Sequence, residues 1–137
     1  MATPTKTLRL RPHLRVEIER IAKRSRRSFS EVAHDLIEEA VRTRECPGIH
    51  FADEPAGRVA KVTGTGLGVW EVIDIYRGLK GNEKRIRALY PRLSAAQLRA
   101  ALLYYERHTD EVETLSADNL ALHEAGRARR ERTARRA

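Results

Sequence analysis

The chain has 137 residues, of which 27 are Lys or Arg and 19 are Asp or Glu, giving a formal net charge of +8 with only 5% aromatic residues. This length suits one ordinary domain or two small ones, and the single cysteine, Cys46, excludes an intrachain disulfide and the disulfide-stapled secreted folds. Apolar runs of a few residues exclude a membrane-spanning helix and Met1–Lys6 has no apolar signal core, so we expect a basic, mainly helical cytoplasmic protein whose leading partner class is nucleic acid.

The N-terminal segment Thr5–Arg11 alternates between polar and apolar residues, which predicts a short strand. Leu8 and Leu10 point to one side, whereas the polar residues Thr5, Thr7, Arg9 and Arg11 point to the other. Pro12 then ends the strand and suits the first turn of a helix.

Two amphipathic helices follow the strand. The first runs from His13 to Arg24 with an apolar stripe, and the second opens at a capping box formed by Ser28 and Glu31. The apolar stripe consists of Leu14, Ile18, Ile21 and Ala22 in the first helix, and of Phe29, Val32, Ala33, Leu36, Ile37, Ala40 and Val41 in the second.

This N-terminal segment, with a net charge of +4 over residues 1–46 (11 basic, 7 acidic), has no partner for its strand and leaves two apolar stripes exposed. Two copies that pair their strands antiparallel and pack four helices around them remove both defects. The resulting ribbon presents Thr5, Thr7 and Arg9 outward, and such a ribbon fits the major groove of B-DNA. The alternative is that the protein comes from a generally Arg-rich proteome, in which surface arginines do not indicate a nucleic-acid partner.

The residues Leu8–Leu14 with the turn Ser28–Glu31 resemble the ribbon-helix-helix repressors of the Arc and CopG type, over roughly residues 5–43. The resemblance implies that Thr5, Thr7 and Arg9 read base edges. It also implies phosphate binding around the second helix, where Arg26 and Arg27 replace the usual turn glycine. The expected phosphate-binding residues are Arg11, Arg26, Arg27, Ser28, Phe29 and Ser30. The alternatives are a dimerisation module without DNA or a lone amphipathic helix pair.

A linker and a hairpin come next. Pro47, Gly48, Pro55 and Gly57 mark turns, and Ile49–Phe51 and Arg58–Val62 read as two short strands joined by residues 53–57. The glycine-rich residues 63–68 lack the spacing of a nucleotide-binding loop, so we expect a tight turn into a helix.

Three helices complete this region, over Val69–Leu79, Glu83–Leu89 and from the Ser94–Gln97 capping box to about His108. A short helix, a turn and a longer helix outline a helix-turn-helix, in which Gln97 and Arg99 are a possible second DNA contact. A plain helical hairpin with a solvated Gln and Arg is the equal alternative. The expected inward residues of the longer helix are Leu98, Ala101, Leu102 and Tyr105.

Residues 47–113 resemble a small winged-helix-like family described as VapB-like antitoxins of unknown function. The landmarks are Pro47-Gly48-Ile49, Val62-Thr63-Gly64-Thr65, Val69-Trp70-Glu71-Val72, Tyr90-Pro91-Arg92-Leu93-Ser94 and the run from Gln97 to His108. The resemblance implies an antitoxin that neutralises a PIN-like ribonuclease. Gly66 stands where the family has an arginine, so the contact of that arginine is in doubt here.

No residue pattern predicts enzymatic chemistry. No two histidines have metal-ligand spacing, and Glu106, His108 and Asp110 straddle a helix end, so we expect no metal, no cofactor and no catalytic residue. The C-terminal segment has a net charge of +3 over residues 116–137 (6 basic, 3 acidic) and almost no apolar residue beyond alanine after Gly126. It is expected to be partly helical or disordered, with a possible toxin or DNA contact at Arg127, Arg129, Arg130 and Arg132.

The predicted organisation is mainly α, with a ribbon-helix-helix domain over 1–44, a linker and hairpin start over 45–57, an antitoxin-like helical module over 58–115 and a basic tail over 116–137. The predicted function is a homodimeric (or higher) repressor of a palindromic DNA operator, which is the antitoxin of a PIN-like ribonuclease and regulates its own operon. The alternatives are an antitoxin whose ribbon only dimerises, and a stand-alone CopG-type regulator without a toxin.

Overall fold

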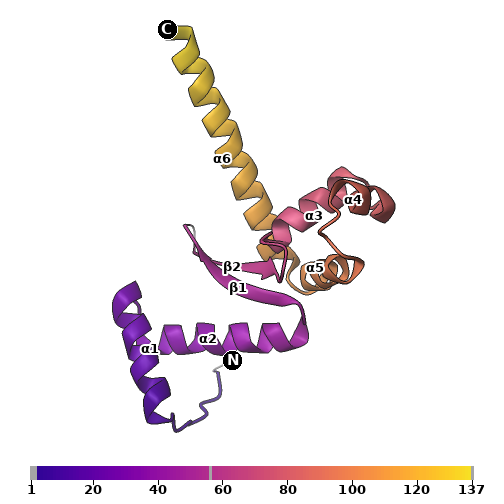
Figure 1. The fold of residues 1–137 in the computed structure, drawn as a ribbon. Coiled ribbons are helices and arrows are strands. Elements are labelled where there is room, and N and C mark those ends of the chain that lie inside the picture. Colours follow the sequence, from indigo (N-terminus) through magenta and orange to yellow (C-terminus); the bar gives the residue numbers. More distant parts are fainter. Residues whose placement is uncertain (1–2, 56, 137) are drawn as a thin grey trace. The chain divides into compact units, whose positions relative to one another are not determined.

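The computed structural model describes residues 3–55 and 57–136 and is mainly helical, with six helices and one two-stranded antiparallel sheet in these ranges (Figure 1). The chain divides into two compact units, Met1–Arg42 and Thr43–Ala137. Each unit has its own cluster of buried apolar residues.

The first unit begins with residues 3–11, which have no regular secondary structure in the single chain, so the predicted strand stays a prediction about two paired copies. Helix α1 spans Pro12–Ser25 and helix α2 spans Phe29–Glu45, so that α2 extends into the second unit. Pro12 occupies the first turn of α1, as predicted. The α2 helix continues to Glu45, beyond Val41, the last residue of its predicted apolar stripe.

The turn between the two helices contains Arg26 in the left-handed conformation, with φ 56° and ψ 38°. Its N–H donates to the carbonyls of Ala22 and Lys23, and the N–H of Arg27 donates to Ala22 O at 3.0 Å. A left-handed residue closing the last carbonyls of a helix is the role that glycine usually fills.

The core of the first unit is small. Only Ile18, Ala22 and Val32 are buried among its described residues, with Leu10, Phe29 and Ala33 packed against them. Leu14 and Ile21 of α1 are exposed in the single chain, as are Leu36, Ile37 and Val41 of α2. Most of the two predicted apolar stripes therefore faces outward.

The second unit begins with a hairpin in which β1 (Ile49–Glu54) pairs antiparallel with β2 (Gly57–Val62). The register places Ile49 opposite Val62 and Glu54 opposite Gly57. The predicted hairpin is confirmed, with strands longer than expected because the turn is tighter. Residue 56, in this turn, lies outside the described residues.

Helices α3 (Val69–Gly78), α4 (Glu83–Leu89) and α5 (Ala95–Arg107) follow the hairpin and confirm the three predicted helices. Each begins at a side-chain cap. Glu71 Oε1 accepts from Gly68 N at 3.1 Å, Asn82 Oδ1 accepts from Arg85 N at 3.1 Å, and Ser94 and Gln97 form the predicted reciprocal capping box.

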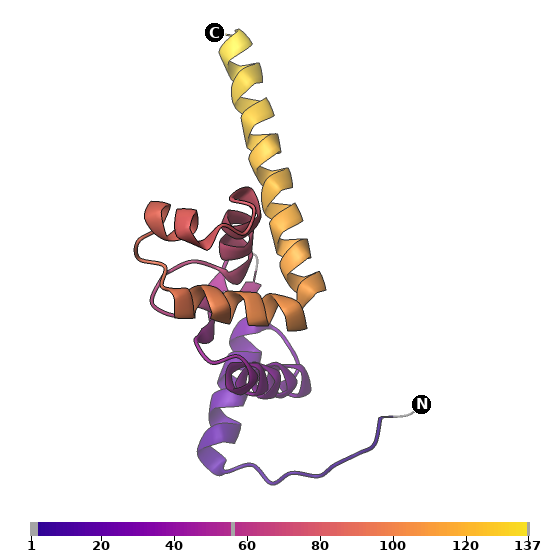
Figure 2. The same cartoon turned by 90° about the vertical axis from the view of Figure 1, so that its right-hand side faces the viewer.

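Helix α6 spans Thr109–Arg136, a continuous helix of 28 residues. The segment expected to be partly helical or disordered is therefore helical as far as Arg136. Helix α6 packs with its first turns against α3 and α5, and its distal half projects beyond the rest of the second unit (Figure 2).

The core of the second unit is formed by the hairpin and by α3, α4, α5 and the start of α6. Tyr104 is fully buried, and Tyr105, which is predicted to lie on the inward stripe of α5, is half-buried and packs against the same core. The core residues are Cys46, Ile49, Ala60, Val62, Val69, Val72, Ile73, Ile86, Leu93, Leu98, Ala101, Tyr104 and Val112. None of the described helices is both long and apolar enough to span a membrane.

Candidate functional site

The N-terminal arm, residues 3–11, carries the side chains predicted to read DNA. Thr5, Thr7, Arg9 and Arg11 are all exposed. Leu10 packs against the small core of the first unit, whereas Leu8 is 69% exposed. The side predicted to face the helices is thus half covered in one copy, and the predicted reading face is open.

The start of α2 is closed by the predicted capping box of Ser28 and Glu31. Ser28 Oγ accepts from the N–H of Glu31 at 3.1 Å and donates to its carboxylate at 3.0 Å. The first turn of a helix leaves N–H groups without an intrahelical acceptor, and here these belong to Phe29 and Ser30. Phe29 itself packs on the core, which fixes the direction of this turn.

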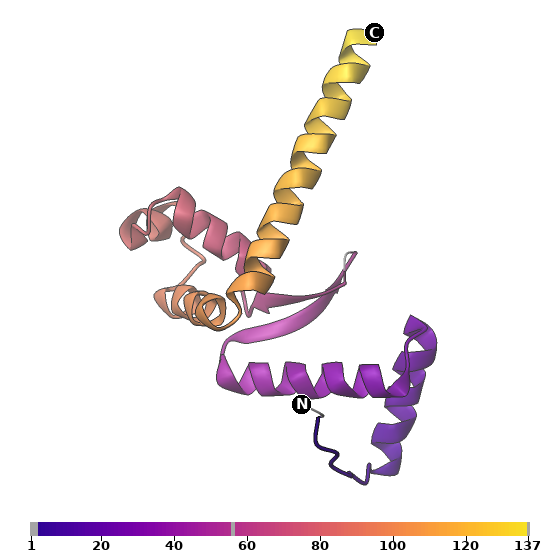
Figure 3. The same cartoon turned by 180° about the vertical axis from the view of Figure 1, so that it is seen from behind.

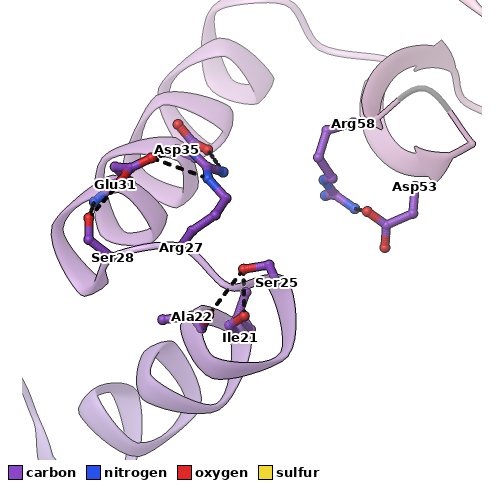
Figure 4. A network of polar contacts seen from close by, with 9 residues as sticks. All are labelled: Ile21, Ala22, Ser25, Arg27, Ser28, Glu31, Asp35, Asp53 and Arg58. Atoms are coloured by element: carbon purple, nitrogen blue, oxygen red, sulfur yellow. Dashed lines mark hydrogen bonds and ion pairs between the residues drawn. The ribbon is translucent and has the colours of Figure 1, made fainter.

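Arg27 is less available to a phosphate than the sequence suggested. Its guanidinium forms ion pairs with Asp35 and with Glu31, the latter at 3.4 Å (Figure 4). The hydrogen bond to Asp35 is the main reason that the pKa of Arg27 is raised, and the hydrogen bonds of Ser28 are the main reason that the pKa of Glu31 is lowered. Arg26, in contrast, is exposed at the end of α1.

The two residues of the second predicted DNA contact, Gln97 and Arg99, lie in different environments. The amide of Gln97 is taken up within the fold, because Oε1 accepts from Ser94 N at 2.8 Å and Nε2 donates to Thr63 O at 3.1 Å. Gly64, with φ +85°, leaves room for this amide. Arg99 is exposed. Gln97 therefore fastens the 63–65 turn to α5, and only Arg99 keeps an exposed side chain at this site.

Gly66 lies in an exposed turn with φ +71°. A Cβ at this position would meet nothing within 4 Å. Glycine is therefore favoured here by the left-handed backbone conformation and not by a lack of space. The turn is held by Thr65, whose hydroxyl donates to Val62 O at 2.7 Å and accepts from Leu67 N at 3.0 Å.

Sequence reasoning missed a polar cluster that joins α3 to α6. Arg77 forms a bidentate ion pair with Glu113, at 2.7 and 3.2 Å, and stacks over the ring of Tyr105, which donates to the same carboxylate. Ser116 donates to Asp74 at 2.7 Å beside it. These partners lie far apart in the sequence, so no local pattern signals the cluster.

No described group of three or more His, Cys, Asp or Glu side chains is arranged to hold a metal ion. The ring of His108 instead lies 4.6 Å from that of Tyr104, which donates to Glu111. The arginines of the C-terminal segment, Arg127, Arg129, Arg130 and Arg132, are exposed along α6.

Comparison with protein-family models, with curated proteins and with solved structures finds no match to this chain.

Proposed function

We propose that this protein is a dimeric, sequence-specific DNA-binding repressor whose N-terminal arms pair into a two-stranded ribbon. The observation that carries the proposal is the first unit itself. It has an arm of alternating character and two helices, yet it buries only Ile18, Ala22 and Val32 among its described residues. Ile37 remains 56% exposed and Val41 49% exposed.

A unit of this size with so small a core does not reach the stability of an independent domain, because small chains bury too little surface on folding. A second copy that covers Leu8, Ile37 and Val41 supplies the missing burial, at about 25 cal/mol per Å² of apolar surface removed from water. The arm gains backbone partners at the same time, since a lone strand has unpaired N–H and C=O groups.

The ribbon then presents Thr5, Thr7 and Arg9 to base edges, while the start of α2 contacts a phosphate. Arg9 suits a guanine, to which arginine donates two hydrogen bonds. The two-fold symmetry of the dimer requires a palindromic operator.

The antitoxin role rests on the resemblance of residues 47–113 and remains part of the proposal. The second unit, on this view, binds a PIN-like ribonuclease, and repression by the complex regulates the operon. The engagement of Gln97 within the fold favours a protein partner over base reading for this unit.

The test compares Arg9→Ala with Lys6→Ala in the full-length protein, on the DNA upstream of its own gene. Both variants remove one positive charge from the same arm, but alternation places only Arg9 on the predicted reading face. We expect Arg9→Ala to weaken specific binding by about 1–3 kcal/mol and to relax selectivity at one base pair.

Lys6→Ala should instead weaken binding to all sequences alike. It should also reduce the slope of log K against log salt concentration by about one. A fluorescence anisotropy titration over a salt series measures both effects. Equal losses for the two variants, with no change of selectivity, would contradict base reading by the arm.

A further inference from the structure

The two halves of helix α6 carry opposite net charges. Residues 110–124 contain five carboxylates and no Lys or Arg, whereas residues 127–136 contain six arginines and one glutamate. The distal half buries no large side chain and projects from the second unit in two views (Figures 2 and 3). Isolated helices are only marginally stable in water, and six closely spaced like charges weaken this one further.

The proximal half of α6 lines a groove of about 310 Å³ together with the hairpin and the start of α3. Its apolar lining includes Val59, Trp70, Leu115 and Leu122, of which Leu122 is 72% exposed. Its charged lining consists of three carboxylates, those of Glu54, Glu71 and Asp118, and of Lys61, which is paired with Glu54. The groove is therefore apolar within and acidic at its rim.

A second hollow lies on the distal half of the same helix, lined by Arg129, Arg132, Thr133 and Arg136. Each of these residues follows a groove residue of α6 by two heptads, the groove residues being Leu115, Asp118, Asn119 and Leu122. Because a heptad repeat drifts by only about 20° per heptad on a straight helix, the acidic groove and the basic hollow share one face of α6.

We infer that this face pairs with the same face of α6 in a second copy of the chain, with the two helices antiparallel. The basic hollow of each copy then lies over the acidic groove of the other. A register centred near Glu124 sets Leu122 against Gly126, Asn119 against Arg129 and Leu115 against Thr133, with Asp118 beside Arg132. Gly126 has no side chain, which lets Leu122 approach the helix backbone closely.

The charges select the antiparallel orientation. A parallel pair would place the six arginines of one copy against those of the other, and like charges face each other at a cost. The antiparallel pair matches opposite charges at both ends and also opposes the two helix dipoles. The long arginine side chains cover apolar surface with their stems while their guanidinium groups reach the carboxylates of the rim.

This inference rests on the second unit alone and holds whether or not the N-terminal arm binds DNA. It assigns Arg129 and Arg132 to a second copy rather than to DNA or a toxin. The two copies in question are those of one ribbon dimer or of two neighbouring dimers, and the cross-linking below reports on either.

The test uses disulfide cross-linking of single-cysteine additions in the full-length protein, for which the wild type is the background control because Cys46 is fully buried. Ala125→Cys lies next to the two-fold axis, so the two thiols meet and should form a covalent dimer on mild oxidation. Asn119→Cys lies on the same exposed face of α6, but in this register its copies are separated by about 15 Å, beyond the reach of a disulfide.

We expect rapid cross-linking of Ala125→Cys, little cross-linking of Asn119→Cys, and a loss of the Ala125→Cys product when Arg132→Glu is added. A further Asp118→Arg substitution should restore the product, because it re-creates the pair with its signs exchanged. Equal cross-linking of both cysteines would show a parallel or random encounter, and no cross-linking above wild type would show that this face of α6 does not pair with a second copy. Either result, or a product insensitive to Arg132→Glu, would overturn the inference.

Discussion

Arg26 ends α1 in a conformation that side-chain-bearing residues adopt only at a cost. Its φ of 56° lies in the left-handed region, where the Cβ of an L-residue is crowded by roughly 1–2 kcal/mol. The position is nevertheless essential to the turn, because the N–H groups of Arg26 and Arg27 close the last carbonyls of α1. The chain therefore retains a cation at a position where glycine would fit better, close to the predicted phosphate-binding turn.

Arg26→Gly should stabilise the first unit by about 0.5–1 kcal/mol, the relief of the strain being partly offset by the greater freedom of glycine in the unfolded chain. Urea unfolding followed by circular dichroism measures the change. Glu19→Gly, at an exposed position within α1, is the matched control and should destabilise by about 1 kcal/mol. A destabilised Arg26→Gly variant would mean that the arginine side chain makes a contribution larger than its backbone strain.

Contacts of individual side chains are the level at which the sequence was least informative. Arg27 and Gln97 are predicted DNA contacts, and the sequence does not reveal that the fold also gives them Asp35 and Thr63 O as partners. The helix periodicity predicts Tyr105 on the inward stripe of α5, but it does not reveal that Tyr104 is fully buried. Such assignments depend on contacts between distant residues, which no local pattern contains.

The elements themselves were predictable to a considerable extent. The glycine-rich turn at 63–68 indicated the start of α3, and the Ser94–Gln97 capping box indicated the start of α5, where the hydroxyl of Ser94 accepts from Gln97 N. The continuous α6 could not be derived from its pattern, because its distal half has no apolar face. The arm has no regular secondary structure in the single chain, and its pairing with a second copy stays a prediction.

The link between α3 and α6 is a second property at the scale of elements. The pKa of Glu113 is lowered from its ordinary value of 4.5, first by the hydrogen bond from Tyr105 and then by Arg77. A carboxylate whose pKa is lower in the folded state contributes stability above its unfolded value, and this contribution is lost as pH falls through the folded pKa. The attachment of α6 should therefore weaken in acid.

We expect the melting temperature of the wild type to fall as pH is lowered from 7 through and below 4.5, and Glu113→Gln to show a shallower fall because it cannot be protonated. At pH 7 Glu113→Gln should melt below the wild type. Tyr105→Phe, which removes the hydroxyl donor but keeps the ring beneath Arg77, should give an intermediate slope. Identical slopes for wild type and Glu113→Gln would exclude this carboxylate from the acid response.

At the scale of the whole molecule, the two units differ in how much of their apolar surface is buried within a single copy of the chain. The second unit surrounds a contiguous core to which the hairpin and four helices contribute. The first unit exposes more large apolar side chains than it buries. The chain thus has one unit with a contiguous core and one whose large apolar side chains are mostly exposed, and its surplus of positive charge lies in the first unit and at the end of α6.

This difference predicts that self-association resides in the exposed apolar face of α2. Ile37→Lys places a charge where the second copy would bury an isoleucine, and an unpaired buried charge is strongly disfavoured. Glu38→Lys is the control, because it introduces the same side chain about 100° around α2 from Ile37, at a position that is already charged, and costs only an exposed ion pair with Arg42, worth less than about 1 kcal/mol. Both variants are made in an Arg132→Glu background, which removes the proposed pairing through α6.

Sedimentation equilibrium should then give a dimer for the background and for Glu38→Lys, but a monomer for Ile37→Lys. The monomer should also lose helical content, since the first unit has too small a core to remain folded alone. A dimer that survives Ile37→Lys would place the contact elsewhere, and a folded monomer in the background protein would remove the basis for the ribbon.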